Sequence, residues 1–180
     1  MPSHAIVALV ALIAAMLLMF GELLVSKAHE RTLLRRGAIE PLDPPFRQMQ
    51  WAYPLVFVAM AVEGAIQEGP PTRIVVAGAV LFLIAKLLKF WAIASLGTFW
   101  TFRIIVLPGV PLVVTGPYRW LRHPNYAAVV GELLGFALLV GARVAGPLGA
   151  VYFGYLLRER IVAEEAALRA NRTSEVRSQK

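Results

Sequence analysis

The sequence predicts an all-α, polytopic membrane protein with about five transmembrane helices. Hydrophobic residues occupy 58% of its 180 positions and the mean hydropathy is +0.66, whereas soluble domains are about 45–50% apolar. Several apolar runs approach the ~20 residues that a helix needs to cross the hydrocarbon core. We expect a single membrane domain over residues 1–180, and the absence of cysteine excludes disulfides and thiolate chemistry.

Three spans are expected within residues 5–96. Apolar residues fill 5–25, and a polar loop with several basic residues and prolines follows over 26–47. The prolines predict that no helix crosses this loop. The second span covers 49–66, and a Gly-Pro-Pro turn separates it from a third span over 74–96.

The second half of the chain contains a connector over 97–125 and then a helical hairpin. The two apolar helices of the hairpin, 126–140 and 144–157, are shorter than the first three spans and meet at a turn that contains Gly and Pro. We expect the hairpin and a charged C-terminal helix to occupy 126–168. A frayed tail is expected over 169–180.

The distribution of charge predicts the orientation of these spans. Most Lys and Arg residues lie in the 26–47 loop, the connector and the tail. Because positive residues are retained on the cytoplasmic side, we expect these segments in the cytoplasm and the N-terminus outside. An odd number of spans then leaves the C-terminus cytoplasmic. The net charge of +7 fits this topology and contact with anionic membrane lipids, and we expect no nucleic-acid partner.

Several ionisable residues fall inside the predicted spans. Lys86 and Lys89 lie toward the cytoplasmic end of the third span, and we expect their side chains to extend to the interface. Glu22 and Glu63 lie near span ends, where solvation at the interface is expected. Glu132 lies within an apolar helix, where a charge is costly. Two interpretations of Glu132 stay open: it contributes to a ligand site, or it forms an ion pair with Lys86 or Lys89.

Gly131 and Gly135 form a Gly-x-x-x-Gly pair in the fourth span. Small residues at this spacing let the backbones of two membrane helices approach closely. We therefore interpret the pair as a packing contact and not as part of the chemistry.

Two polar clusters flank the hairpin. Residues 116–126 contain Arg, His and Tyr between two apolar segments, and residues 158–165 begin where the last apolar helix ends. In the second cluster Arg160 and Glu164 lie one helical turn apart and can pair. The predicted topology brings both clusters to the same membrane face. Carboxylates there can bind an ammonium group or ribose hydroxyls, and arginines can bind a carboxylate. We therefore predict a site for a charged ligand.

Other kinds of site have little support. The sequence lacks the Gly-x-Gly-x-x-Gly and Walker motifs, which argues against a Rossmann or P-loop nucleotide site. Its three scattered histidines predict no metal site. No serine has a histidine and a carboxylate at the spacing of a catalytic triad.

The combination of polar residues resembles the isoprenylcysteine carboxyl methyltransferase family. The resemblance covers residues 90–168, and the stretches 90–100 and 103–109 are similar to its small bacterial branch. The motif residues are Gly116-Pro-Tyr118, Arg122-His123-Pro124-Asn-Tyr126, Glu132 and Arg160-x-x-x-Glu164-Glu165.

The resemblance implies an integral-membrane, S-adenosylmethionine-dependent methyltransferase without a Rossmann domain. Its connector and last helices would enclose the cofactor at the cytoplasmic face. The resemblance assigns cofactor binding to Tyr118, His123, Tyr126, Glu132 and Glu164. It assigns acceptor binding or catalysis to Arg122, Arg160 and Glu165. The chain departs from the family after Glu165, because residues 166–177 lack the Phe-Gly and Tyr residues that help to close the site.

The acceptor is expected to be lipophilic, since an apolar scaffold lets it enter from the bilayer. A methyl sulfonium is already electrophilic, so catalysis needs mainly alignment of the nucleophile. The bacterial resemblance favours O-methylation of an alkylated phenol or pyrone hydroxyl, or of a lipid-linked carboxylate, at the bacterial inner membrane. Two alternatives stay open: phosphatidylethanolamine-type N-methylation, and a non-catalytic membrane scaffold whose connector binds anionic lipid. The sequence also leaves the oligomeric state open.

Overall fold

The computed structural model describes the backbone of residues 2–178 and the side chains of residues 2–170. The described chain is all-α, as predicted, and it forms no strand beyond an isolated bridge between Ile39 and Val106. The α-helices are α1 (Ser3–Arg35), α2 (Pro44–Ile66), α3 (Thr72–Leu96), α4 (Pro124–Val140) and α5 (Ala145–Ser178). Two short 3-10 helices, η1 (Gly97–Phe99) and η2 (Gly116–Arg119), lie in the connector.

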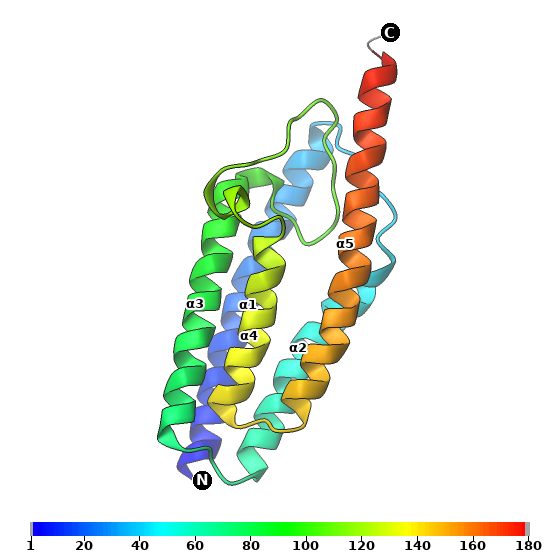
Figure 1. The fold of residues 1–180 in the computed structure, drawn as a ribbon. Helices are drawn as coiled ribbons and strands as arrows, with labels where there is room; N and C mark the ends of the chain where they lie inside the picture. The colour runs from blue at the N-terminus through cyan, green and yellow to red at the C-terminus, as the bar shows by residue number, and fades with distance from the viewer. Residues whose placement is uncertain (1, 179–180) are drawn as a thin grey trace.

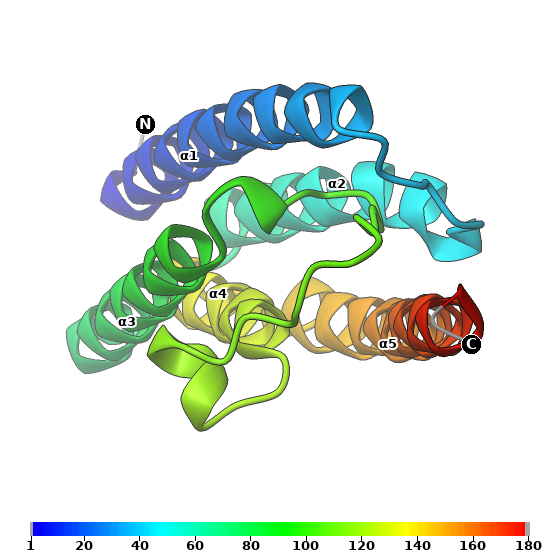
Figure 2. The same ribbon diagram turned by 90° about the horizontal axis from the view of Figure 1, so that it is seen from above.

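Successive helices run in alternating directions, so the two termini lie at opposite ends of the bundle (Figure 1). The 36–43 loop, the 97–123 connector and the charged half of α5 gather at the end that carries the C-terminus. The view along the bundle shows the connector crossing this end above the helices (Figure 2). The two polar clusters that the sequence indicated therefore share one end of the molecule.

Three helices have the length and hydropathy to cross a membrane, namely α1, α2 and α3 with its extension to Phe99. The shorter helix α4 is apolar but has 17 residues, which span about 26 Å against a hydrocarbon core of about 30 Å. The apolar part of α5 is shorter still. Of the about five transmembrane helices expected, the described residues thus contain three long candidate spans and a shorter apolar helix, and the helices of the hairpin are shorter than the first three, as predicted.

The outward surface of the bundle is apolar. Leu17 is 67% exposed, Leu55 61% and Leu83 59%, on α1, α2 and α3 respectively. Exposed apolar surface of this extent is unfavourable in water and matches contact with lipid. Large buried side chains, including Phe57, Leu133 and Phe136, fill the space between α2, α4 and α5. The exposed and buried residues together indicate an integral membrane protein.

Three helix ends differ from the sequence prediction. Helix α2 begins at Pro44, five residues before the expected start at residue 49, because proline is tolerated in the first turn of a helix. The first helix continues to Arg35, whereas the loop was expected to begin at residue 26. Residues 26–35 contain neither Gly nor Pro, and the first break comes at Gly37, which has a φ of 85°. Helix α5 likewise continues through the expected frayed tail to Ser178, because residues 158–178 also lack Gly and Pro. Positions 179–180 of that tail lie outside the described residues.

The pair of helices α3 and α4 packs through small residues. A Cβ atom added at Gly131 would lie 2.9 Å from the Cβ of Ala85, and one at Gly135 would collide with the backbone of Phe82. A Cβ at Gly78 would collide with the backbone of α4 in the same way. The prediction that Gly131 and Gly135 mark a close helix contact is confirmed.

A buried charge cluster joins three helices at mid-bundle, formed by Glu22, Lys86, Lys89 and Glu132. Lys86 Nζ lies 2.8 Å from Glu22 and 2.9 Å from Glu132, and Lys89 Nζ lies 2.7 Å and 3.2 Å from the same two carboxylates. All four side chains are at most 4% exposed. Tyr53 of α2 donates a hydrogen bond to Glu132 at 2.6 Å. The expectations that the lysines reach the interface and that Glu22 is solvated are therefore wrong. The lysines and the glutamates neutralise one another inside the bundle, because a buried charge without a partner is costly.

Glu63 is only partly buried, which agrees with the expected solvation, and it also has a structural role. Its carboxylate accepts hydrogen bonds from the backbone N–H groups of Arg143, Val144 and Ala145, at 2.8, 2.9 and 2.6 Å. These donors lie at the start of α5, where backbone N–H groups have no partner within the helix. Glu63 of α2 therefore caps α5 and fixes its lower end.

Candidate active site at the connector end of the bundle

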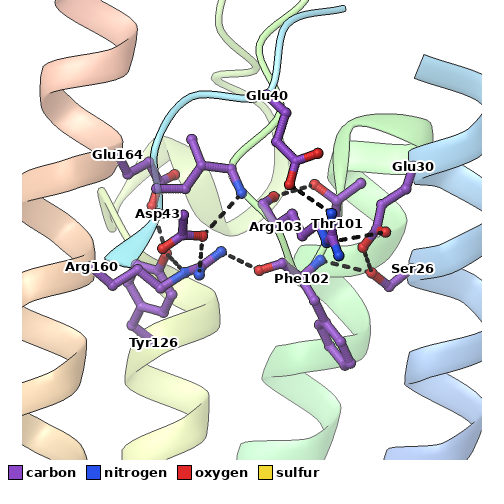
Figure 3. Close-up of polar contacts among 11 residues, drawn as sticks. Ser26, Glu30, Glu40, Asp43, Thr101, Phe102, Arg103, Tyr126, Arg160 and Glu164 are labelled. Atoms are coloured by element: carbon purple, nitrogen blue, oxygen red, sulfur yellow. Dashed lines mark hydrogen bonds and ion pairs between the residues drawn. The ribbon is translucent and has the colours of Figure 1, made fainter. Parts of the chain in front are cut away.

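Arg160 of α5 is the centre of a polar site at the connector end (Figure 3). Its side chain is 7% exposed. Nη1 donates to Asp43 Oδ2 at 2.7 Å, Nε donates to the Tyr126 hydroxyl at 3.1 Å, and Nη2 donates to the Phe102 carbonyl. These partners come from the 36–43 loop, from α4 and from the connector. Because a guanidinium is planar and always charged, contacts on three sides fix its orientation.

Tyr126 links Arg160 to Glu164. Its hydroxyl donates to a Glu164 oxygen at 2.6 Å while it accepts from Arg160. The His123 ring stacks on the Tyr126 ring, with 5.5 Å between centroids and 19° between planes. Pro124 starts α4 between these two residues, and proline favours the first helical turn because it lacks an N–H group. The start of α4 thus presents both rings to α5.

Tyr118 lies on η2, beside this group. Burial raises the pKa of its phenol well above the ordinary value, and the negative charge of Glu164 raises it further. Tyr118 is therefore protonated at neutral pH and can donate a hydrogen bond. Tyr118 is therefore close enough to Glu164 to be affected by its charge, and Glu164 is the carboxylate that Tyr126 contacts.

Glu165 lies on the outer side of the site. It pairs with Arg122 at 3.2 Å and with Arg169 at 3.1 Å, and His123 Nε2 lies 3.7 Å away. The Arg122 side chain is 84% exposed. The predicted site residues therefore form two groups in the described structure: a buried group around Arg160, and an exposed group around Glu165.

Glu132 lies apart from both groups. Its carboxylate is fully buried and is surrounded by Lys86, Lys89 and Tyr53. The second interpretation of this residue, an ion pair with Lys86 or Lys89, is confirmed for both lysines. Glu132 and Tyr126 share α4, so the buried charge cluster holds the helix that carries Tyr126.

Asp43 is a site residue that the sequence did not indicate. It lies 117 positions from Arg160 and directly before Pro44 and Pro45. An Asp at this place is typical of a helix N-cap. In the structure it makes no side-chain cap bond to α2, and its Oδ2 accepts from Arg160 and, at 3.4 Å, from the Ile104 N–H.

Helix α1 holds the connector in place over the site. Ser26 Oγ accepts from the Phe102 N–H at 2.7 Å, and His29 Nδ1–H donates to the Trp100 carbonyl at 2.8 Å. Trp100 in turn donates through its indole to Asn125 at 3.3 Å. These bonds fix the segment whose Phe102 carbonyl contacts Arg160. The part of α1 that was expected to be loop thus supports the site.

Known proteins resemble this chain over most of its length. Residues 78–170 match the family model described as isoprenylcysteine carboxyl methyltransferase (ICMT) family. The uncharacterized protein YpbQ of Bacillus subtilis (strain 168) is 34% identical over 148 residues, which are 82% of this chain and 88% of that protein. An uncharacterized protein of Haemophilus influenzae is 27% identical over 150 residues, 83% of this chain and 87% of that protein. No solved structure shows significant similarity to the chain.

The matched segment contains every site residue that the sequence predicted, from Tyr118 to Glu165. It also contains all of α3 from residue 78 onward and the whole of α4, and the close contact of these helices positions the start of α4. Asp43 lies outside it. Family membership suggests a membrane methyltransferase. The chain belongs to the isoprenylcysteine carboxyl methyltransferase family.

Proposed function

We propose that this protein is an integral-membrane, S-adenosylmethionine-dependent O-methyltransferase that acts on a lipophilic acceptor. One observation carries the proposal. The family-matched segment brings Arg160, Tyr126 and Glu164 into one hydrogen-bonded chain at the end of an apolar bundle. A charged small molecule and a membrane-soluble one can meet at such a place.

The donor set fits the cofactor. S-adenosylmethionine carries a sulfonium and an ammonium group, which carboxylates stabilise, and a carboxylate, which arginine and protonated histidine can bind. Glu164 offers a carboxylate beside the Tyr118 and Tyr126 phenols, and His123 stacks on Tyr126. We assign these four residues to the cofactor. Glu132 supports them indirectly, by its ion pairs beneath the start of α4.

When bound, the cofactor supplies an electrophilic methyl group. The work left to the protein is to align the acceptor oxygen and to exclude water. The Arg160 side chain extends from α5 and is fixed by α4, the 36–43 loop and the connector, so we assign it to positioning the acceptor. The exposed Arg122 and the half-buried Glu165 form an ion pair at the same end, and we assign them to closing the site around the ligands.

A groove between α2 and α5 supports entry of the acceptor from the bilayer. It has a volume of about 600 Å³ and opens on the outer surface of the bundle. Its lining is mainly apolar, with Arg47 and Gln48 at the end nearer the site. A long alkyl chain fits such a groove with its head group toward the connector end. We propose an alkylated phenol or pyrone hydroxyl, or a lipid-linked carboxylate, as the acceptor.

We also propose that the connector end faces the cytoplasm of a bacterial cell. Residues 26–47, the connector and residues 158–180 contain 14 of the 18 Lys and Arg residues, and basic residues are retained on the cytoplasmic side of the inner membrane. The cofactor is made in the cytoplasm, so this orientation gives it direct access.

Binding of S-adenosylhomocysteine to the purified protein in detergent tests the proposal. We expect calorimetry to show binding, and Tyr126→Phe and Glu164→Gln to weaken it about tenfold or more, because each removes a charge-assisted hydrogen bond. Glu159→Gln is a matched control, since Glu159 is exposed on the same helix. A parent protein that binds no S-adenosylhomocysteine would favour the non-catalytic scaffold instead.

A further inference from the structure

Asp43 has one carboxylate oxygen that the folded chain does not use. Its side chain is 7% exposed. Oδ2 accepts from Arg160 and from the Ile104 N–H, whereas Oδ1 is buried without a hydrogen-bond partner among the described residues. Buried polar atoms are nearly always paired, and an unpaired one is costly. An oxygen left open beside the central arginine of a site is therefore a candidate for contact with a ligand.

We infer that Oδ1 of Asp43 accepts the hydrogen bond, and then the proton, of a neutral hydroxyl group on the acceptor. The inference rests on the proposed O-methyltransferase function and selects between the two acceptor classes that it allows. Asp43 lies before residue 78, where the family match begins, so this role comes from the N-terminal part of the chain.

The local charge favours a hydroxyl over a carboxylate. Arg160 already contacts Asp43 directly and Glu164 through the Tyr126 hydroxyl. A carboxylate acceptor would add a third negative charge beside a single guanidinium and would compete with Asp43 for it. Like charges in a partly buried site repel strongly. A neutral hydroxyl adds no charge and offers the O–H donor that Oδ1 lacks.

The groove between α2 and α5 brings an acceptor to this oxygen. Arg47, at one end of the groove, lies one helical turn from Asp43, which is about 6 Å of helix rise. The groove continues past Trp51 and Leu55 toward the middle of the bundle. In this proposal an alkyl chain in the groove directs its head group toward the end of α2 that carries Asp43.

The chemical step balances with Asp43 as the proton acceptor. The hydroxyl oxygen forms a bond to the methyl carbon, and the bond from that carbon to sulfur breaks with its electron pair remaining on sulfur. The hydroxyl proton passes to Oδ1, which turns the Asp43 carboxylate into a neutral acid. The sulfonium donor becomes a neutral thioether, and the proton returns to water when the products leave.

Asp43→Asn tests this role, because asparagine keeps the size of the side chain and an oxygen for Arg160 but cannot take up the proton. We compare a long-chain alkylphenol, which is neutral at pH 7, with an alkylated acidic pyrone, which is already ionised and which the parent should methylate more slowly because its charge adds to those of Asp43 and Glu164. Transfer to the phenol should fall about 100-fold or more, as for loss of a general base. Transfer to the ionised acceptor should fall less than about tenfold. The loss on the phenol should shrink as pH rises toward about 10, where phenols ionise.

Binding gives a readout that does not depend on turnover. By calorimetry, S-adenosylhomocysteine should bind Asp43→Asn within about threefold of the parent, while the alkylphenol should bind the cofactor-loaded variant more weakly. Glu40→Gln, in the same loop and paired with Arg103 at the surface, should change neither measurement. Asp43→Glu keeps a proton acceptor and should retain the parent's pattern between the two acceptors, which tests the idea even if Asp43→Asn does not fold.

Three results would overturn the inference. Equal losses on the phenol and the ionised acceptor would mean that Asp43 only positions Arg160. Loss of S-adenosylhomocysteine binding in a folded Asp43→Asn would move Asp43 to the cofactor. Efficient methylation of a lipid carboxylate by the parent, with the phenol unreactive, would reverse the acceptor class. Failure of the parent to bind S-adenosylhomocysteine is a different outcome, because it removes the proposed function itself.

Discussion

Lys86 of α3 and Glu22 of α1 form a buried ion pair, with 2.8 Å between Nζ and Oε1. The same ammonium lies 2.9 Å from Glu132 of α4, so three helices meet at one charge. Helix α1 lies before residue 78, where the family match begins. The pair therefore attaches the N-terminal helix, and the connector that this helix holds, to the family core.

Glu22→Gln should destabilise the protein strongly. The change leaves Lys86 and Lys89 with one carboxylate between them, and an uncompensated buried charge typically costs about 3–5 kcal/mol. We expect a clear fall in the midpoint of thermal unfolding in detergent. The control Glu68→Gln, at an exposed position, should leave the midpoint unchanged.

A charge-balanced double variant separates charge from shape. Combining Glu22→Gln with Lys86→Met removes one charge of each sign, so Lys89 and Glu132 can still pair at 3.2 Å. The double variant should recover part of the stability that Glu22→Gln loses. If Glu22→Gln alone unfolds like the parent, the buried charge cluster does not stabilise the fold.

The helices could be predicted from sequence because their signals are local. Apolar runs gave α2, α3 and α4 to within a few residues, and the Gly131–Gly135 spacing gave the close approach of α4 to α3. The Arg160–Glu164 spacing predicted that the two side chains can pair, which the structure shows only as an indirect link. In the structure the Tyr126 hydroxyl joins them. Each of these inferences depends on residues within one helix.

The partners across helices could not be predicted in the same way. Nothing in the sequence around Glu22 indicates that it faces Lys86, 64 positions away, because that depends on how α1 is rotated and packed. Asp43 resembles a helix N-cap, yet Arg160 is its partner. Interface solvation was a reasonable expectation for Glu22 from its position near a span end. In the structure, however, the neighbouring helices bury the Glu22 side chain, and it pairs with Lys86 and Lys89.

Topology reporters test the proposed orientation. Fusions at Gly37 and at the C-terminus should both report the cytoplasm, and a fusion at Gly69 should report the outside, because the 36–43 loop and the C-terminal half of α5 lie at one end of the bundle. Alkaline phosphatase and a fluorescent protein give opposite signals for each position. If both the C-terminus and Gly37 were external, the protein would have the opposite orientation in the membrane, and the site would have no access to cofactor from the cytoplasm.

Tyr118 should resist ionisation at alkaline pH. Burial raises the pKa of its phenol above the ordinary value of 10, and the charge of Glu164 adds to this. The neutral phenol is the favoured form in the folded state, so its contribution to stability is complete below pH 10 and is lost as pH rises above 10. In an ultraviolet titration of the folded protein to pH 11, Tyr118→Phe should remove little of the tyrosinate signal. Loss of a full tyrosine equivalent near pH 10 would show a solvated phenol.

Arg160 should matter for methyl transfer more than for cofactor binding. Its guanidinium contacts Asp43, Tyr126 and the Phe102 carbonyl, and Arg160→Ala removes all three contacts. Loss of a charge-assisted contact in a dry site typically costs about 2–4 kcal/mol of transition-state stabilisation, or roughly 30- to 1,000-fold in rate. We expect that loss in methyl transfer to a panel of lipophilic phenols and pyrones, with S-adenosylhomocysteine binding changed only a few-fold.

Arg160→Lys distinguishes geometry from charge. Lysine keeps the positive charge beside Asp43 but cannot donate from three nitrogens of a planar group to partners on three sides. Its rate should therefore lie between those of the parent and Arg160→Ala, with stability close to the parent because Asp43 stays paired. Arg158→Lys, an exposed change on the same helix, should have no effect. Parent-like activity in Arg160→Ala would show that Arg160 takes no part in the reaction. Equal losses of cofactor binding and of rate would make Arg160 part of the cofactor site, because only a contact with the bound cofactor would weaken both to the same extent.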